Sequence, residues 1–223
     1  METARGAVRF VVASDEPQTR DILAAMGYLP VDERRSATRW FPPSPGLDRY
    51  FQRFAASIER MVLQKAGRCA VPWDAALLEL LRRVEGTRLR WWLYGSGALA
   101  VRGLAVQPRD IDLRVDDAAL AGDVCDDLLV TPVERLDGWV AKHAGRAFCH
   151  AVLEWLAEPD PELDDPGAPS EQGVFVEPDL EALAWRGHVI RVPPLAAQLR
   201  SCEQRGLAER AALIRRAMRP GRE

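Results

Sequence analysis

Two carboxylates stand two residues apart at the start of an apolar run, at Asp110 and Asp112. Because side chains on a strand alternate between faces, both aspartates point to one side while Ile111 and Leu113 point to the other. Carboxylates held side by side repel each other, and they are tolerated where a divalent cation or a proton lies between them. Adjacent carboxylate oxygens suit Mg²⁺, which binds through one or two carboxylates plus substrate phosphates. Asp110 and Asp112 are therefore predicted to hold one or two magnesium ions.

A turn suited to anion binding lies upstream of this pair. An apolar run over 91–94 ends at Gly95 and Ser96, and a helix-like segment follows. At a strand-to-helix turn, backbone N–H groups and a hydroxyl can bind an anion. Arg109, directly before Asp110, is either a further phosphate ligand or a solvated loop cation. The order of these parts predicts strand, helix and strand, with an anion site at the first junction.

These residues resemble the motif of the DNA polymerase beta-like nucleotidyltransferase superfamily. Tyr94-Gly95-Ser96 and Asp110-Ile111-Asp112-Leu113 match its two halves, and the spacer 97–109 is at the long end. The chain is most similar to the small bacterial antibiotic nucleotidyltransferases, through a Trp-Trp-Leu-Tyr-Gly start and an Arg-Asp-Ile-Asp-Leu finish. The resemblance is specific over 90–115, looser over 116–218, and absent over 1–70.

The resemblance implies an Mg²⁺-dependent enzyme that moves a nucleoside monophosphate from a nucleoside triphosphate to an acceptor hydroxyl. Gly95 and Ser96 would then bind the β- and γ-phosphates, with Arg109 beside them. The implied acceptor is a small molecule such as an aminoglycoside or lincosamide. RNA or tRNA modification is one alternative, and a catalytically silent domain that binds a partner or nucleotide is another.

The same resemblance implies a third carboxylate on a later strand, and Glu154 is the candidate. If 148–156 is a strand, His150, Val152 and Glu154 share one face. A lone acid in so apolar a run needs an explanation, since a buried unpaired carboxylate is costly. Metal binding or general-base work would supply one; a surface or ion-paired position is the alternative. Glu177 is the competing candidate.

Composition narrows the class of protein. The chain has 223 residues, 48% of them hydrophobic, and a formal net charge of −3. This balance argues against a dedicated nucleic-acid binder with a broad basic surface. The four cysteines show no metal-ligand spacing and are expected to be reduced thiols. Without an apolar run of membrane-spanning length or a signal-peptide pattern, a cytoplasmic location is expected.

The elements that position these residues follow from periodicity and turn residues. The expected fold class is α+β: a nucleotidyltransferase-like mixed β-sheet flanked by helices. The expected domains are an N-terminal α/β extension (1–70), the nucleotidyltransferase core (71–192) and a C-terminal helical segment (193–223). Expected strands are 7–13, 90–94, 110–115, 130–134, 138–142, 148–156, 174–177 and 188–192. Expected helices are 17–26, 48–65, 73–86, 96–103, 117–129, 193–205 and 207–218, with loops at 40–47 and 158–172.

Overall fold

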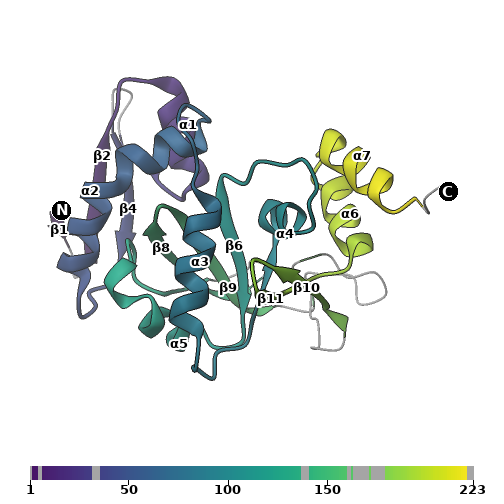
Figure 1. Ribbon diagram of the computed structural model, residues 1–223. Helices are drawn as coiled ribbons and strands as arrows, with labels where there is room; N and C mark the ends of the chain where they lie inside the picture. The colour runs from purple at the N-terminus through teal and green to yellow at the C-terminus, as the bar shows by residue number, and fades with distance from the viewer. Residues whose placement is uncertain are drawn as a thin grey trace.

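The computed structural model describes most of the chain as a mixed α/β protein (Figure 1). The described residues are 2–4, 7–31, 36–136, 141–159, 162, 171 and 179–219. The strand expected at 174–177, with the competing candidate Glu177, lies outside them.

A five-stranded mixed sheet forms the centre of the molecule, in the order β5-β6-β9-β8-β7. Within it, β6 runs antiparallel to β5 and parallel to β9, while β8 is antiparallel to β9 and β7. The expected mixed sheet flanked by helices is confirmed. Its strands are β5 (Trp91–Tyr94), β6 (Asp110–Val115), β7 (Glu134–Arg135), β8 (Ala141–Cys149) and β9 (Ala151–Pro159).

The alternation of residue types decides how this sheet is covered. On β6, Ile111, Leu113 and Val115 are buried at 3% exposure or less, whereas Asp110 and Asp112 are half-buried. The apolar face packs against α3 (Trp73–Val84), and α5 (Ala118–Val124) covers the neighbouring β8 and β9 on the same side (Figure 1). Neither helix covers the opposite, acidic face of the sheet.

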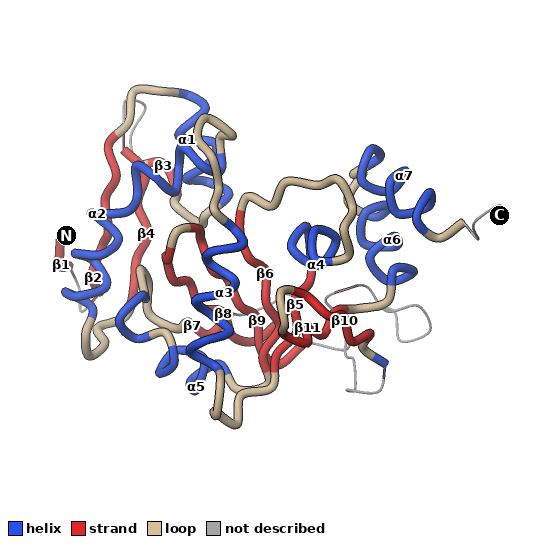
Figure 2. Tube along the Cα trace, in the orientation of Figure 1, coloured by secondary structure: helices blue, strands red, loops and turns tan. Residues whose placement is uncertain are grey.

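An N-terminal unit precedes the central sheet, and Figure 2 shows it on the left of the molecule. It contains a second sheet, in the order β1-β2-β4-β3, together with two helices. One hydrophobic cluster runs from this unit, through Phe10 and Phe54, into the central sheet at Leu153 and Trp155. The elements are β1 (Glu2–Ala4), β2 (Ala7–Ala13), α1 (Pro17–Ala25), β3 (Leu29–Pro30), β4 (Ser36–Phe41) and α2 (Leu47–Lys65).

The remaining elements are a connecting helix, a hairpin and two C-terminal helices. Helix α4 (Gly95–Val101) connects β5 to β6, and the hairpin of β10 (Glu181–Trp185) and β11 (His188–Val192) lies against β5. Helices α6 (Leu195–Gln204) and α7 (Ala208–Ala217) pack together at the C-terminal side (Figure 1).

Four sequence expectations need correction. The strand expected over 130–134 does not form up to Val133, and β7 begins only at Glu134. The single strand expected over 148–156 belongs instead to a hairpin, because the chain turns at His150, which has a left-handed φ of 61°. Trp40 and Phe41, expected in a loop, end β4, where Phe41 is fully buried. The helix expected over 117–129 stops at Val124, and a short 3-10 turn follows (Asp126–Leu128).

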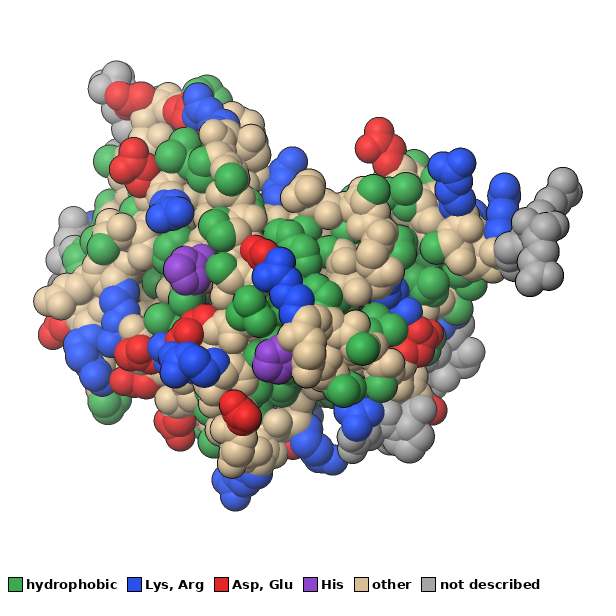
Figure 3. Space-filling model, viewed as in Figure 1, with side chains coloured by type: hydrophobic (Ala, Val, Ile, Leu, Met, Phe, Trp, Pro, Cys, Tyr) green, Lys and Arg blue, Asp and Glu red, His purple; other side chains and the backbone are tan. Residues whose placement is uncertain are grey.

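Surface charge, cysteine state and helix hydrophobicity can be compared with the expectations from composition. On the face drawn in Figure 3, acidic and basic side chains are interspersed rather than gathered by sign. All four cysteines are free thiols. No helix in the described part of the chain is long and apolar enough to cross a membrane.

Candidate functional site

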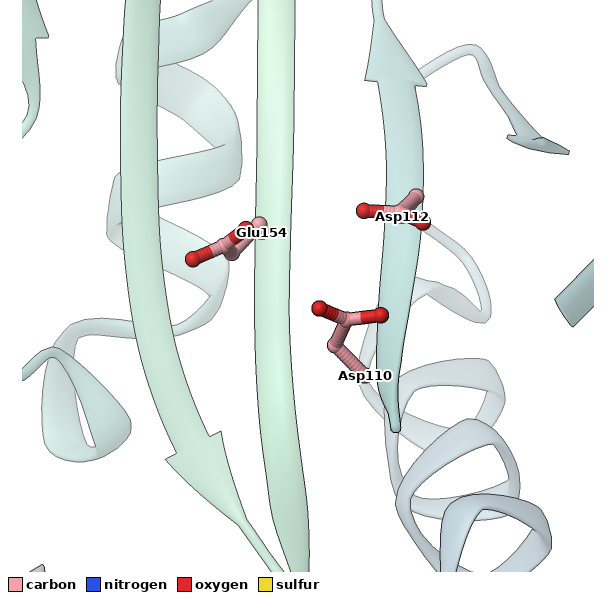
Figure 4. A group of neighbouring side chains, drawn as sticks. All are labelled: Asp110, Asp112 and Glu154. Carbon is pink, nitrogen blue, oxygen red and sulfur yellow. The ribbon is translucent and has the colours of Figure 1, made fainter. Parts of the chain in front are cut away.

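Three carboxylates meet on the acidic face of the central sheet. Asp110 and Asp112 project from β6, and the parallel register of β6 and β9 places Glu154 opposite Asp112 (Figure 4). One oxygen of each carboxylate lies within 4.8 Å of the others. The sequence prediction that Glu154 lies beside the aspartates is therefore correct in geometry, while the catalytic role remains a prediction.

Lys65, the last residue of α2, reaches into this cluster from the N-terminal unit. Its Nζ lies 2.7 Å from Asp110 Oδ2 and 3.9 Å from Glu154 Oε1. Burial opposes the ammonium charge, but Glu154 and Asp110 outweigh it and raise the pKa of Lys65. A permanent cation thus bridges two of the three acids.

Arg146 supplies the second positive charge. It is the cross-strand partner of Glu154 on β8, and its Nε donates to Glu154 Oε1 at 2.6 Å. Burial would raise the pKa of Glu154, but Arg146 and Lys65 bring it below its ordinary value. Glu154 is accordingly ionised in the folded protein.

Asp112 is the acid without a compensating partner. No donor among the described residues makes a hydrogen bond to it, although Tyr94 is its cross-strand neighbour on β5. Burial first, then the charges of Asp110 and Glu154, raise the pKa of Asp112 well above its usual range. Repulsion among the three acids therefore favours the protonated form of Asp112.

Gly95 brings the strand-to-helix turn against the carboxylates. Its φ is +64°, and a Cβ there would overlap Asp112 Oδ2, so only glycine fits without a shift. The Gly95 N–H donates to Glu171 Oε2 at 2.9 Å. A buried carboxylate thus already occupies a donor that the sequence assigns to phosphate.

Helix α6 holds that carboxylate in place. Gln198 Nε2 donates to Glu171 Oε2 and to Gly95 O, both at 3.2 Å, and Ser201 Oγ accepts from the Glu171 N–H at 3.0 Å. Burial raises the pKa of Glu171, and the hydrogen bonds from Gly95 and Gln198 offset part of that rise.

The other sequence candidates have different surroundings. Ser96 is buried beside Gly95 at the start of α4. Arg109 is exposed, and its Nη1 donates to the Lys65 carbonyl at the end of α2. Arg102 pairs with Glu181 and donates to the Pro193 carbonyl, so it holds the C-terminal elements. His150 lies in the β8–β9 turn, not beside Glu154 on a strand; the Gln64 amide donates to its carbonyl.

Sequence analysis missed Lys65, Arg146 and Glu171. Lys65 carried one usable signal, because it is one of only two lysines in a chain otherwise rich in arginine. Arg146 could have been found only by pairing β8 with β9 in the correct register. Nothing in the local sequence of Glu171 distinguishes it from the other acids around it.

Comparison with solved structures finds partial backbone similarity at low sequence identity. A Thermotoga maritima protein provisionally assigned as a nucleotidyltransferase is 18% identical, with a TM-score of 0.49, over 64% of this chain and 90% of that one. The lincosamide antibiotic adenylyltransferase LnuA, bound to lincomycin, is 19% identical, with a TM-score of 0.38, over 55% and 81%. ANT(2″)-Ia in complex with adenylyl-2″-tobramycin is 12% identical, with a TM-score of 0.40, over 66% and 90%.

No protein-family model matches the sequence, and no curated protein matches it. The similarity concerns the course of the backbone, so the chemistry has to come from the residues of this chain.

Proposed function

We propose that this chain is an Mg²⁺-dependent nucleotidyltransferase that transfers a nucleoside monophosphate from a nucleoside triphosphate to a hydroxyl of a small molecule. One observation carries the proposal: Asp110, Asp112 and Glu154 converge within 4.8 Å on one sheet face, against the Gly95 turn. Two neighbouring strands and a strand-to-helix turn thus bring three acids and an anion-binding backbone together.

The donor set fits magnesium. All three groups offer carboxylate oxygens, the ligand type that Mg²⁺ prefers. Asp112 is half-buried and accepts no hydrogen bond from the described residues, which leaves it available to a cation. Asp110, Asp112 and Glu154 would hold one or two ions, which would polarise the phosphoryl group and stabilise the departing pyrophosphate charge.

The chain's own groups have separate tasks in this scheme. The Gly95 N–H and the Ser96 hydroxyl would donate to the β- and γ-phosphates, with Arg109 at the edge of the site. Glu154, kept ionised by Arg146 and Lys65, would accept the hydrogen bond of the acceptor hydroxyl and orient it. Lys65 would limit the negative charge that the triphosphate meets.

The acceptor is proposed to be small. The net charge of −3, together with the mixed charges on the face drawn in Figure 3, favours a small acceptor over RNA. Two of the similar structures hold lincomycin and adenylyl-2″-tobramycin, which makes lincomycin and tobramycin the first acceptors to try here. A cytoplasmic location remains an expectation from the sequence.

A second candidate is a catalytically silent nucleotidyltransferase-like domain, and two contacts favour it. Lys65 already neutralises Asp110 at 2.7 Å, and Glu171 already accepts from Gly95. In a silent domain these internal partners would permanently replace the metal and the phosphate.

Pyrophosphate release distinguishes the two candidates. Each of the four nucleoside triphosphates is incubated with the protein and Mg²⁺, alone and with lincomycin, tobramycin or bulk tRNA. Acceptor-dependent release is expected, and Asp112→Asn should reduce it at least 100-fold. Asp123→Asn, which removes an exposed acid on α5, is the matched control and should behave like the wild type. Release that survives Asp112→Asn, or no release under any condition, contradicts the proposed enzyme.

A further inference from the structure

A recess of about 250 Å³ adjoins Glu154 on the side away from the aspartates. Its floor is the acidic face of β9 and β8 together with the end of β7, where Leu136, Ala144 and Leu156 contribute apolar surface. Glu154 is the one residue of the carboxylate cluster among its lining residues. The same side chain therefore faces the candidate metal site and this recess.

The N-terminal unit builds the opposite wall. Ala25, Met26 and Gly27 line the recess at the end of α1, and Arg39 lines it from β4. Arg39 Nη1 and Arg146 Nη1 both donate to the Met26 carbonyl, at 2.8 Å and 3.1 Å. The two guanidinium groups thereby fix the wall against the sheet.

The charged side chains that line the recess balance one another. Arg39 pairs with Glu134 and Arg146 pairs with Glu154, so two cations face two carboxylates. Each glutamate uses one oxygen in its ion pair, and the described residues make no hydrogen bond to the other. Neighbouring donors and acceptors of this kind suit hydroxyl groups, each of which can donate and accept.

Size and charge favour a small ligand. A volume of 250 Å³ lies just below the roughly 300–1,000 Å³ of typical small-molecule sites, so it suits one substituted saturated ring. A polyphosphate or an RNA backbone would need an excess of positive charge, and the lining has none. Leu136 and Leu156 can pack against ring carbons while the ion pairs meet the ring hydroxyls.

We propose that this recess is the acceptor site and that it takes one ring of a polyhydroxylated small molecule, with the reacting hydroxyl at Glu154. The proposal rests on the proposed transferase activity. The acceptor oxygen forms a bond to the α-phosphorus, the bond from that phosphorus to the bridging oxygen of the β-phosphate breaks, and pyrophosphate leaves. The hydroxyl proton passes to Glu154 and from there to solvent. The N-terminal unit therefore selects the acceptor.

Two neighbouring alanines allow a matched test. Ala25 lines the recess, whereas Ala24 does not, and both are exposed on α1. Ala25→Trp should fill the mouth of the recess and raise the KM for the acceptor at least tenfold, while Ala24→Trp leaves it unchanged. The dissociation constant for Mg²⁺-nucleotide, measured by calorimetry, should be the same in both variants and the wild type. Equal acceptor KM values in the two variants, or transfer to bulk tRNA only, overturn the acceptor site.

Direct binding separates this proposal from the activity. Saturation-transfer NMR with myo-inositol, glucosamine and lincomycin needs no turnover. Binding that Ala25→Trp abolishes and Ala24→Trp retains supports the recess as a polyol site even if no nucleotide is transferred. If none of the three probes binds the wild type and none serves as an acceptor, the proposed ligand class is wrong.

Discussion

At the scale of single residues, the candidate site is a balance of charges. Asp110 and Glu154 have cationic partners in Lys65 and Arg146, whereas Asp112 has none. The repulsion within the cluster therefore falls mainly on Asp112. Replacing this acid is expected to stabilise the metal-free protein.

Asp112→Asn should raise the stability of the metal-free protein, and the gain should grow with pH. Because the folded pKa of Asp112 is raised, the folded state holds the proton more tightly than the unfolded chain. The stability that this tighter proton binding gives the wild type is fully present below the unfolded pKa, about 4 for aspartate. It is lost as pH rises through the folded pKa of Asp112. Thermal midpoints with EDTA from pH 4 to pH 8 measure the effect. A pH-independent difference, or the same gain in Asp123→Asn, would contradict it.

Lys65→Met should destabilise the metal-free protein by about 2 kcal/mol, because Asp110 loses its partner at a largely buried position. Added Mg²⁺ should stabilise this variant more than the wild type, since the ion then supplies the missing positive charge. Lys142, the only other lysine, is exposed, and Lys142→Met serves as the control. Denaturant unfolding with and without Mg²⁺ gives the loss of unfolding free energy and the gain from the ion. Equal losses of unfolding free energy in Lys65→Met and Lys142→Met would contradict the bridging role.

At the scale of elements, sequence patterns predicted what is local. Strands 7–13, 110–115 and 188–192 were predicted with their observed bounds, because alternation or turn residues mark both ends. The β8–β9 hairpin was missed because its turn carries His150 rather than glycine or proline inside a continuous apolar run.

Alternation predicted the common face of Asp110 and Asp112, the family resemblance supplied Glu154, and neither predicted the counter-charges. Glu154 joins the aspartates because β9 pairs in parallel with β6 and places it opposite Asp112. Lys65 comes from a helix that ends 45 residues before Asp110, and Glu171 is 76 residues from Gly95. Such contacts depend on how α2 and α6 pack in the folded protein, which the local sequence pattern does not predict.

The α4 turn offers a test of element geometry. Gly95→Ala should destabilise the protein more than Gly86→Ala does, although both glycines have similar positive φ, +64° and +73°. A Cβ at Gly86 meets nothing within 4 Å, whereas a Cβ at Gly95 meets Asp112. The Gly86 variant reports backbone strain alone, about 1 kcal/mol, and the excess at Gly95 measures the approach of the turn to the acid. Equal losses would mean that the turn relaxes freely.

At the scale of the whole molecule, three separate parts of the chain meet at the site. The N-terminal unit supplies Lys65, the central sheet supplies the acids, and α6 supplies Gln198. The unrecognised first 70 residues are therefore part of the site's architecture.

Glu171 on the Gly95 N–H has a consequence for measured nucleotide affinity. If a phosphate binds that donor, it must compete with a tethered anion whose effective concentration is fixed by the fold. The apparent dissociation constant is then the intrinsic value divided by the fraction of molecules in which the donor is vacant.

Glu171→Ala should accordingly tighten nucleotide binding about tenfold, equivalent to about 1.4 kcal/mol. Glu59→Gln, at an exposed acid on α2, should leave the affinity unchanged. Calorimetric titration with a non-hydrolysable triphosphate and Mg²⁺ makes the comparison, and unchanged affinity in Glu171→Ala would mean that no phosphate uses this donor. A weak nucleotide affinity in the wild type would then reflect internal competition rather than a poor fit between the nucleotide and its site.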